Sequence, residues 1–264
     1  MKYTVGFIGA GNMGGALLRA AVKAKGENEI SFFDPDASKV ESTANETKAS
    51  YLPSEEVCKE SKFVFFGVKP NVIGKIAKSL SPYLSTENVV VSMAAGTSVS
   101  EIASFVGEDK KIIRIMPNTP AAAGAGMILY CMNENVTEDD EKEFLSVMSE
   151  AGAIDKLDEK LIDAAAALSG CGPAFVYMFI EALADGAVAC GLPRAKAMTY
   201  AKQTVLGAAT LAITTDKHPG ELKDAVCSPG GTTIEGVLAL EDGAFRGTAA
   251  SAVIAAYEKT NKLK

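Results

Sequence analysis

The sequence of 264 residues predicts an α/β domain with a parallel sheet, followed by an all-helical domain. Up to residue 157, short β-branched or aromatic runs alternate with amphipathic stretches, which is the pattern of βαβ units. From residue 158 onward that alternation stops, and segments rich in Ala, Leu and Gly with helical periodicity replace it. We therefore expect one domain over residues 1–157 and a second over residues 158–264.

Six runs of the first domain are predicted to form strands. Most are nearly continuous apolar segments, as expected of strands covered by helices on both faces. They are residues 4–9, 29–34, 62–68, 88–93, 111–116 and 126–131. Helices are expected between them, including residues 11–24, 37–46 and 72–80, and the acidic segment 137–152 is expected to form the last helix of this domain.

Composition excludes several classes of protein. The chain is 48% hydrophobic and 22% charged, which is ordinary for a soluble globular protein, and its net charge of -7 argues against nucleic-acid binding. We expect no secretion signal and no membrane span, because charges or glycines interrupt every apolar run. The five cysteines show no CxxC or Cys/His pairing, which predicts reduced thiols, no metal site and a cytoplasmic location.

A glycine-rich turn follows the first predicted strand. Gly9, Gly11 and Gly14 have GxGxxG spacing between that strand and the first helix, which is the context this motif requires. Gly9 permits the tight turn, Gly11 lets the backbone approach a pyrophosphate, and Gly14 lets helix and strand pack closely. The first N–H groups of the helix then face the anion. The motif predicts a Rossmann-type dinucleotide site, and the alternative is a tight turn without a ligand.

Asp34 stands 20 positions after Gly14, at the end of the second predicted strand. A carboxylate there binds a free ribose 2′-hydroxyl and repels a 2′-phosphate, which favours NADH over NADPH. The alternative is that Asp34 starts a turn or caps the next helix, as Asp-Pro often does. Ser38 and Lys39 remain able to bind a phosphate.

Two more loops follow predicted strands at the edge of the sheet where ligands bind in open α/β sheets. Residues 67–70, "GVKP", end the third strand, and residues 93–98, "MAAGTS", end the fourth. Small residues in both loops leave room for a dinucleotide, and Lys69 favours phosphate.

A second candidate site lies in the helical domain, in "SPGGTTIEG". Thr232 and Glu235 have the S/T-x-x-E spacing of a capping box at the start of a helix. The backbone N–H groups of residues 230–233 then form a neutral nest that suits a small carboxylate. An ordinary connection between two helices is the alternative. The apolar surplus of this domain predicts burial against another subunit, as a symmetric dimer at least.

Several motifs together resemble pyrroline-5-carboxylate reductase, the last enzyme of proline synthesis. They are "GFIGAGNMG", "GVKP", "SMAAG", "MPNTPA", "LSGCGPAF" and "HPGELKDAVCSPGGTTIEGV", in this order along almost the whole chain. The resemblance implies a Rossmann domain followed by a helical dimerisation domain, with decamers built from dimers. Ala225 and Asp34 depart from the family pattern, so the cofactor preference cannot be transferred from the family.

The residues and the resemblance together give the candidate site. NADH or NADPH is expected on Ile8, Gly9, Ala10, Gly11, Asn12, Met13, Gly14, Asp34, Gly67, Val68, Lys69, Pro70, Met93, Ala94 and Ala95. The resemblance places 1-pyrroline-5-carboxylate on Gly230, Gly231, Thr232 and Thr233, with the Thr233 hydroxyl beside the ring nitrogen. It also places Glu159 at the substrate, and the alternative for Glu159 is a first-turn acid that serves the helix dipole.

The predicted reaction is hydride transfer to a cyclic imine. An imine can arrive protonated, so no strong general acid is required; we expect Thr233 to orient the ring nitrogen and His218, the only histidine, to be structural. One alternative is a hydroxyacid dehydrogenase, which needs a base for the hydroxyl proton. Residues 169–194 contain no lysine and no histidine, which favours the imine. The other alternative is a nicotinamide-binding regulator without catalysis.

Overall fold

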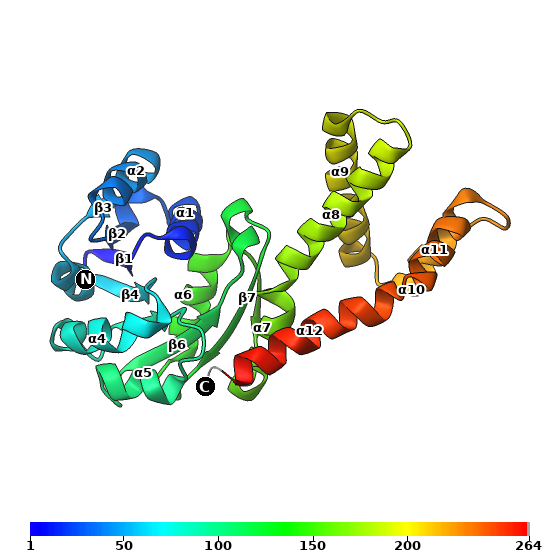
Figure 1. Ribbon diagram of the computed structural model, residues 1–264. Helices are drawn as coiled ribbons and strands as arrows, with labels where there is room; N and C mark the ends of the chain where they lie inside the picture. Colours follow the sequence, from blue (N-terminus) through cyan, green and yellow to red (C-terminus); the bar gives the residue numbers. More distant parts are fainter. Residues whose placement is uncertain (263–264) are drawn as a thin grey trace. The chain divides into compact units, whose positions relative to one another are not determined.

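The computed structural model describes residues 1–262, which form two compact units (Figure 1). The first unit comprises residues 1–170 together with the chain from Tyr257 onward, and the second is Cys171–Ala256. The predicted boundary after residue 157 stays a prediction. The last strand ends at Lys156, but the compact unit continues to Gly170.

The first unit is built on one eight-stranded sheet in the order β3-β2-β1-β4-β5-β6-β7-β8. The six predicted strands are confirmed to within two residues at each end. Two short strands, β3 and β8, were not predicted. The bounds are β1 Tyr3–Ile8, β2 Ile30–Phe33, β3 Ser50–Tyr51, β4 Ser61–Phe66, β5 Val89–Ser92, β6 Lys111–Met116, β7 Gly126–Met132 and β8 Gly152–Lys156.

The predicted parallel sheet is confirmed except at β7, which runs antiparallel to β6. Only residues 117–125 connect the two strands, and they contain a single short 3-10 helix, η3 (Thr119–Ala123). A parallel crossover needs a dozen or more residues, so a connection this short returns the chain in the opposite direction. The remaining neighbouring pairs, including β7 with β8, are parallel.

Seven α-helices accompany this sheet (Figure 1), and its strands are mostly buried except for β3 and β8. Alternate side chains of β4 point to opposite faces of the sheet. Phe63 and Phe65 pack in the core with α1 and α6, whereas Val64 and Phe66 pack with α3, α4 and α5. The short 3-10 helices η1 (Glu27–Glu29) and η2 (Ser81–Tyr83) complete the connections. The helices are α1 Asn12–Lys25, α2 Ala37–Thr47, α3 Ser54–Glu60, α4 Pro70–Leu80, α5 Val99–Val106, α6 Glu138–Met148 and α7 Glu159–Ser169.

Helix α6 is the acidic helix that the sequence predicts, although it ends at Met148 and β8 follows it. It begins with a capping box between Thr137 and Asp140, and the buried Asp140 carboxylate also binds Lys62 at 2.9 Å and Lys111 at 3.0 Å. Burial raises the pKa of Asp140, but the Thr137 hydroxyl and the two lysines outweigh it and hold this pKa below its ordinary value. The carboxylate therefore ties α6 to β4 and β6.

The second unit is helical, as predicted, and it leaves most of its side chains exposed. Within residues 171–256, all of which the structure describes, the buried apolar side chains are Ala184, Ala197 and Ala201, where α8 packs on α9. Large exposed side chains include Met178 and Ile213. The helices are α8 Gly172–Ala189, α9 Arg194–Thr214, α10 Pro219–Val226, α11 Thr232–Asp242 and α12 Phe245–Asn261, the last of which continues into the first unit.

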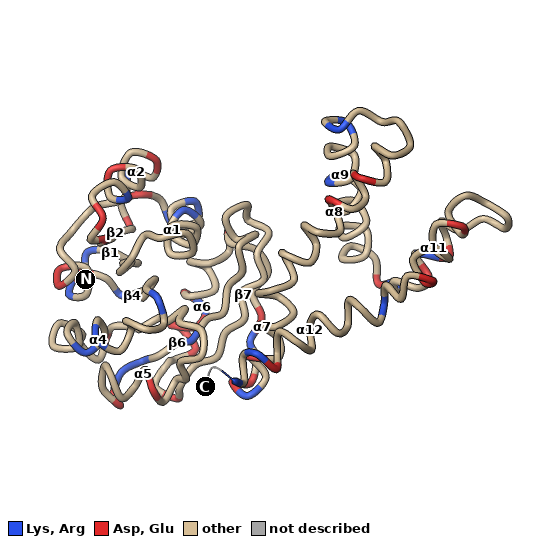
Figure 2. The backbone as a smooth tube through the Cα atoms, in the orientation of Figure 1, with Lys and Arg blue, Asp and Glu red and all other residues tan. Residues whose placement is uncertain are grey.

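Charges are sparse on these helices. Figure 2 shows long uncharged stretches on α8 and α12, and α12 carries no charged residue between Gly247 and Tyr257. By length and composition alone, one helical stretch within residues 1–262, Glu159–Ala189, is also long and apolar enough to cross a membrane, with a mean hydropathy of 1.4. Only 6% of the apolar window within Glu159–Ala189 is buried among residues 1–262, so most of this helix surface is left uncovered there.

Candidate functional site

The glycine-rich turn joins β1 to α1 and lies against the end of β4. Gly9 has a positive φ of 104°, and its N–H donates to the carbonyl of Phe33 at 2.7 Å. A Cβ atom on Gly14 would overlap the carbonyl oxygen of Gly9, and a Cβ on Gly67 would lie 2.7 Å from the same oxygen. The predicted roles of Gly9 in the turn and of Gly14 in close packing are therefore confirmed.

Gly11 differs from these two glycines because it faces open space. It is the N-cap of α1, no side chain caps the helix there, and a Cβ atom at this position would meet nothing within 4 Å. The first N–H groups of α1 therefore have no side-chain acceptor at the N-cap, which is the arrangement that binds phosphate at helix N-termini. This open cradle fits a pyrophosphate.

A cavity of about 400 Å³ brings the three predicted loops together. Its lining comes from the glycine turn, from the loop after β4 and from the loop after β5, with one lysine from α2: Gly11, Asn12, Met13, Lys39, Gly67, Val68, Lys69 and Met93. A neighbouring cavity of about 290 Å³ shares Gly11, Asn12 and Lys39 and adds Ala10, Arg19, Ser38, Ser42 and Thr43. We call the two together the dinucleotide cleft.

The remaining predicted cofactor residues lie behind this cleft or beside it. Ile8 and Ala94 are buried, and Pro70 is the first residue of α4, directly after Lys69. The loop after β5 turns tightly, since Thr97 N–H donates to the Ala94 carbonyl and Gly96 has a φ of 75°. The structure thus gathers the three segments at the edge of the sheet where the parallel strands β1, β4 and β5 end.

Asp34 lies next to the cleft, but its carboxylate already has two partners. Oδ2 accepts the N–H of Ala10 at 2.8 Å, and Oδ1 accepts the N–H of Asp36 at 2.9 Å. The side chain is buried, and Asp36 rather than Asp34 caps α2 by accepting the N–H of Ser38. The sequence placed Asp34 correctly at the end of β2; the structure adds that it holds the glycine turn and starts the next turn.

Two of the cations that line the cleft are paired with acids. Lys39 lies 3.8 Å from Asp36, and Arg19 lies 3.3 Å from Glu46. These pairs are at least partly exposed to solvent, so each is weak and a phosphate can compete for the cation.

The "SPGG" loop connects α10 to α11 in the second unit. Gly230 has a positive φ of 66°, and the N–H of Gly231 donates to the Ser228 carbonyl at 3.0 Å. The predicted capping box is wrong, because Gly231 is the N-cap of α11 and no side chain caps this helix. Thr232 and Thr233 are instead its first two residues, and both are exposed. Their N–H groups belong to the first turn, where a helix has no acceptor of its own.

His218 has the structural role that the sequence predicts. Its Nδ1 atom accepts the N–H of Gly220 at 3.0 Å, so this side chain is the N-cap of α10. The cap fixes the start of the helix that leads into the SPGG loop.

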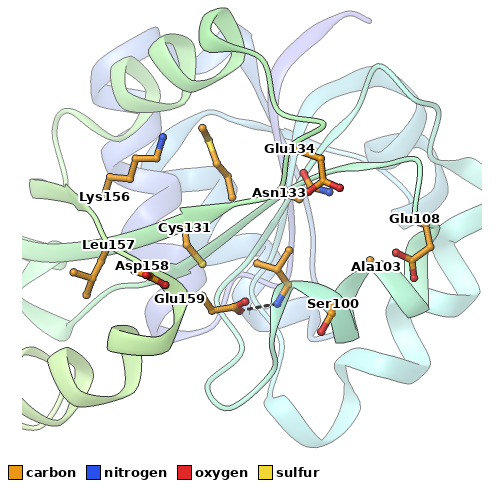
Figure 3. A pocket seen from close by; sticks show the side chains of 12 residues that line it. Ser100, Ala103, Glu108, Cys131, Asn133, Glu134, Lys156, Leu157, Asp158 and Glu159 are labelled. Carbon is orange, nitrogen blue, oxygen red and sulfur yellow. Dashed lines mark hydrogen bonds between the residues drawn. The ribbon is translucent and has the colours of Figure 1, made fainter.

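Glu159 is the first residue of α7, and its Oε1 atom has two partners. It accepts the N–H of Val99 at 2.8 Å and binds Arg114 Nη1 at 3.0 Å, while Arg114 Nη2 lies 3.2 Å from Asp163. Figure 3 shows Glu159 between Asp158 and Ser100 among the side chains that line a cavity, with Glu108 and Glu134 farther from it, and the volume of this cavity is about 610 Å³. Neither Arg114 nor Asp163 was predicted to be a site residue. The sequence holds a signal for Arg114, which is a lone arginine inside the apolar strand "KIIRIM".

The thiols differ in their surroundings. Burial raises the pKa of both Cys58 and Cys131 to about 12, which keeps them protonated, while Cys171 and Cys190 are exposed. Within residues 1–262 no group of three or more His, Cys, Asp or Glu side chains is placed to hold a metal ion.

Two known families match the two parts of the chain. A family described as pyrroline-5-carboxylate reductase dimerisation matches residues 159–263, and one described as NADP oxidoreductase, coenzyme F420-dependent, matches residues 4–96. A pyrroline-5-carboxylate reductase of Glycine max is 42% identical over 269 residues, covering 99% of this chain and 96% of its own length. The enzyme of that name from Escherichia coli K12 is 40% identical over 267 residues, covering 100% and 99%.

Solved structures agree with this assignment. A pyrroline carboxylate reductase of Plasmodium falciparum with NADP bound has a TM-score of 0.87 and 34% identity, covering 98% of each chain. A pyrroline-5-carboxylate reductase of Coxiella burnetii has a TM-score of 0.92 and 30% identity, covering 100% of this chain and 99% of its own. The similarity extends over both units.

Proposed function

The chain belongs to the pyrroline-5-carboxylate reductase family, and from this premise we propose how its residues divide the work of the reaction. The protein is an oxidoreductase of proline biosynthesis, which reduces 1-pyrroline-5-carboxylate to proline with NADH or NADPH. The main support for this assignment of residues is Gly11, which is open to the dinucleotide cleft that three loops form.

The dinucleotide cleft holds the cofactor, whose reduced nicotinamide supplies the hydride when bound. Support for this comes from the chain itself. Backbone N–H groups at the start of α1 lie where a pyrophosphate needs donors, Lys39 and Lys69 line the same cavity, and Gly67 keeps the loop after β4 close to the glycine turn.

The start of α11 holds the substrate. Gly230, Thr232 and Thr233 are exposed and offer backbone N–H groups and the positive end of a helix dipole to the substrate carboxylate, while Gly231, whose N–H donates to Ser228, shapes the loop between them. The Thr233 hydroxyl orients the ring nitrogen, which can arrive protonated, so holding the imine in place is the main task of these residues. The predicted contact of Glu159 with the substrate stays a prediction, because its Oε1 is committed to Val99 and Arg114.

A cofactor assay tests this function. The purified protein is mixed with NADH or NADPH and with 1-pyrroline-5-carboxylate, with a 3-hydroxy acid and NAD or NADP, or with no substrate. We expect oxidation of the reduced cofactor with the imine alone. Turnover of the hydroxy acid in place of the imine would favour a hydroxyacid dehydrogenase, and binding of cofactor without any turnover would favour a regulator.

We further propose that the protein prefers NADH. The charge of Asp34 lies beside the cleft, and it repels a 2′-phosphate even though both carboxylate oxygens accept backbone N–H groups. Lys39 and Ser38 oppose this preference, because they can bind a phosphate in the smaller cavity of the cleft.

The preference is tested with Asp34→Asn, which keeps an oxygen acceptor but removes the charge. We expect kcat/KM to be higher with NADH in the wild type, and the NADPH-to-NADH ratio of kcat/KM to rise roughly tenfold in the variant. Lys39→Gln is the matched control and should lower the same ratio. A wild-type enzyme that is more efficient with NADPH would refute the proposal.

Self-association follows from the dimerisation family that matches residues 159–263. We propose that the exposed apolar faces of α8, α9, α11 and α12 pack against a second chain rather than against lipid, and that these dimers assemble into decamers. We also propose that the enzyme is cytoplasmic and binds no nucleic acid. Native mass spectrometry and a vesicle-flotation assay test these points. A monomer, or recovery of the protein with vesicles, would contradict the proposal.

A further inference from the structure

An ion cluster in which Arg114 and Asp163 are buried and the Glu159 side chain is 35% exposed lies next to the loop that follows β5. The Arg114 guanidinium bridges Glu159 and Asp163, two acids one helical turn apart on α7. The Arg114 side chain is only 4% exposed, and its Nε atom has no hydrogen-bond partner among the described residues, so Nη1 and Nη2 carry its polar contacts in the cluster. Because the Arg114 guanidinium is buried, leaving its charge without an acid partner is costly.

Two residues of this cluster are linked to the two ends of the loop between β5 and α5, one through strand pairing and one through a hydrogen bond. Arg114 of β6 pairs in register with Ser92, the last residue of β5. Residues 93–98 then form the loop, and Val99, the first residue of α5, donates its N–H to Glu159 (Figure 3). The six residues between these anchors include Met93, which lines the dinucleotide cleft.

The capping box at the start of α5 does not use the N–H group of Val99. Ser98 and Glu101 form a complete capping box, in which Glu101 accepts the Ser98 N–H and Ser98 Oγ accepts the Glu101 N–H. The Val99 N–H lies between these two in the first turn, where no carbonyl of the helix can accept it. Glu159 thus takes up a donor that α5 leaves unused, and it does so from another helix.

We propose that Arg114, Glu159 and Asp163 are positioning residues that fix the loop of residues 93–98 for cofactor binding. Arg114 orients Glu159, Glu159 holds the start of α5, and the loop between Ser92 and Val99 is thereby kept in the shape that lines the cleft. Asp163 holds the second Nη atom, so the guanidinium cannot rotate away. This inference rests on the proposed place of the cofactor beside Met93.

Glu159→Ala and Glu159→Gln test the proposal in the full-length protein. The dissociation constant of NADH is measured by fluorescence without substrate, and the KM for the imine substrate is measured at saturating cofactor. We expect the alanine variant to bind NADH about tenfold more weakly, which is the effect of losing one charge-assisted hydrogen bond. The glutamine variant keeps an oxygen for Val99 and should recover most of the affinity, with the substrate KM unchanged in both.

Glu134→Ala is the control, because Glu134 lines the same cavity and is exposed. Arg114→Lys, which keeps the charge but only one bond, should weaken NADH binding less than Glu159→Ala does. Unchanged NADH affinity together with a raised substrate KM in Glu159→Ala would overturn the proposal and return Glu159 to the substrate site. A wild type that binds NADH but does not reduce the imine would refute the proposed function alone, since the affinity comparison needs no turnover.

Discussion

Gly11 and Gly14 lie three residues apart in one motif, and alanine at the two positions should impair different properties of the protein. At Gly14 a Cβ atom would overlap the carbonyl oxygen of Gly9, which is backbone and cannot rotate away. At Gly11 a Cβ atom would meet nothing within 4 Å, and the φ of −66° there suits alanine. The first substitution therefore acts on the fold and the second on the ligand.

The magnitudes follow from the contacts. Overpacking costs about 1–3 kcal/mol, and the backbone contact at Gly14 puts it at the upper end. Alanine returns up to about 1 kcal/mol within α1 because glycine is the poorer helix former, which leaves a loss of roughly 2 kcal/mol and a fall in Tm of roughly 4–8 °C. At Gly11, alanine is the poorer N-cap and costs about 1 kcal/mol or less.

Thermal unfolding followed by circular dichroism measures the first effect, and fluorescence titration with NADH and NADPH measures the second. We expect Gly11→Ala to bind either cofactor at least about tenfold more weakly, because its methyl group occupies the cradle. Wild-type cofactor affinity in Gly11→Ala would refute the placement of the dinucleotide. A Tm of Gly14→Ala equal to that of Gly11→Ala would refute the close contact of helix and strand.

Three further predictions concern other parts of the chain. Asp140→Asn should lower the free energy of unfolding by about 3 kcal/mol at neutral pH. The folded-state pKa of Asp140 lies below its ordinary value, so this stabilisation is complete above about pH 4 and is lost as the pH falls further. Urea unfolding at a series of pH values measures it, with Asp139→Asn, at an exposed carboxylate, as the control. Thr233→Ala should lower kcat without changing the NADH dissociation constant, and Thr233→Ser should restore turnover; equal loss of both in the alanine variant would contradict the assigned role. Cys58 and Cys131 should react with a thiol reagent only after unfolding, as mass spectrometry of labelled peptides can show, and labelling of either in the native enzyme would contradict their burial.

The sequence predicted those parts of the fold that have a strong local signal. Apolar runs located six strands, and the roles of Gly9 and Gly14 followed from their spacing and place between strand and helix. Strand β8 was missed because "GAIDK" is short, partly charged and half exposed, so it shows no apolar run. The antiparallel direction of β7 could have been predicted, because the nine residues between β6 and β7 are too few for a parallel crossover.

The site was harder to predict because spacing gives the place of a side chain but not its partners. Asp34 was located correctly, yet nothing in the sequence shows that its oxygens accept the N–H groups of Ala10 and Asp36. The spacing of Thr232 and Glu235 predicted Thr232 as the N-cap of α11. The helix begins one residue earlier than this pattern requires, because Gly231 is the N-cap. Arg114 meets Glu159 across 45 positions of sequence, and only the packing of α7 on β7 brings them together.

The sparse burial within α8 to α12 has a consequence for the stability of the protein. A helical unit in which only three alanines are fully buried apolar side chains lacks the buried apolar surface that an independent fold requires. Its folding is then a second-order process, in which the association constant contributes to the free energy of the native state. The melting temperature should accordingly rise with total enzyme concentration, and dilution alone should loosen the helices while the sheet of the first unit stays folded.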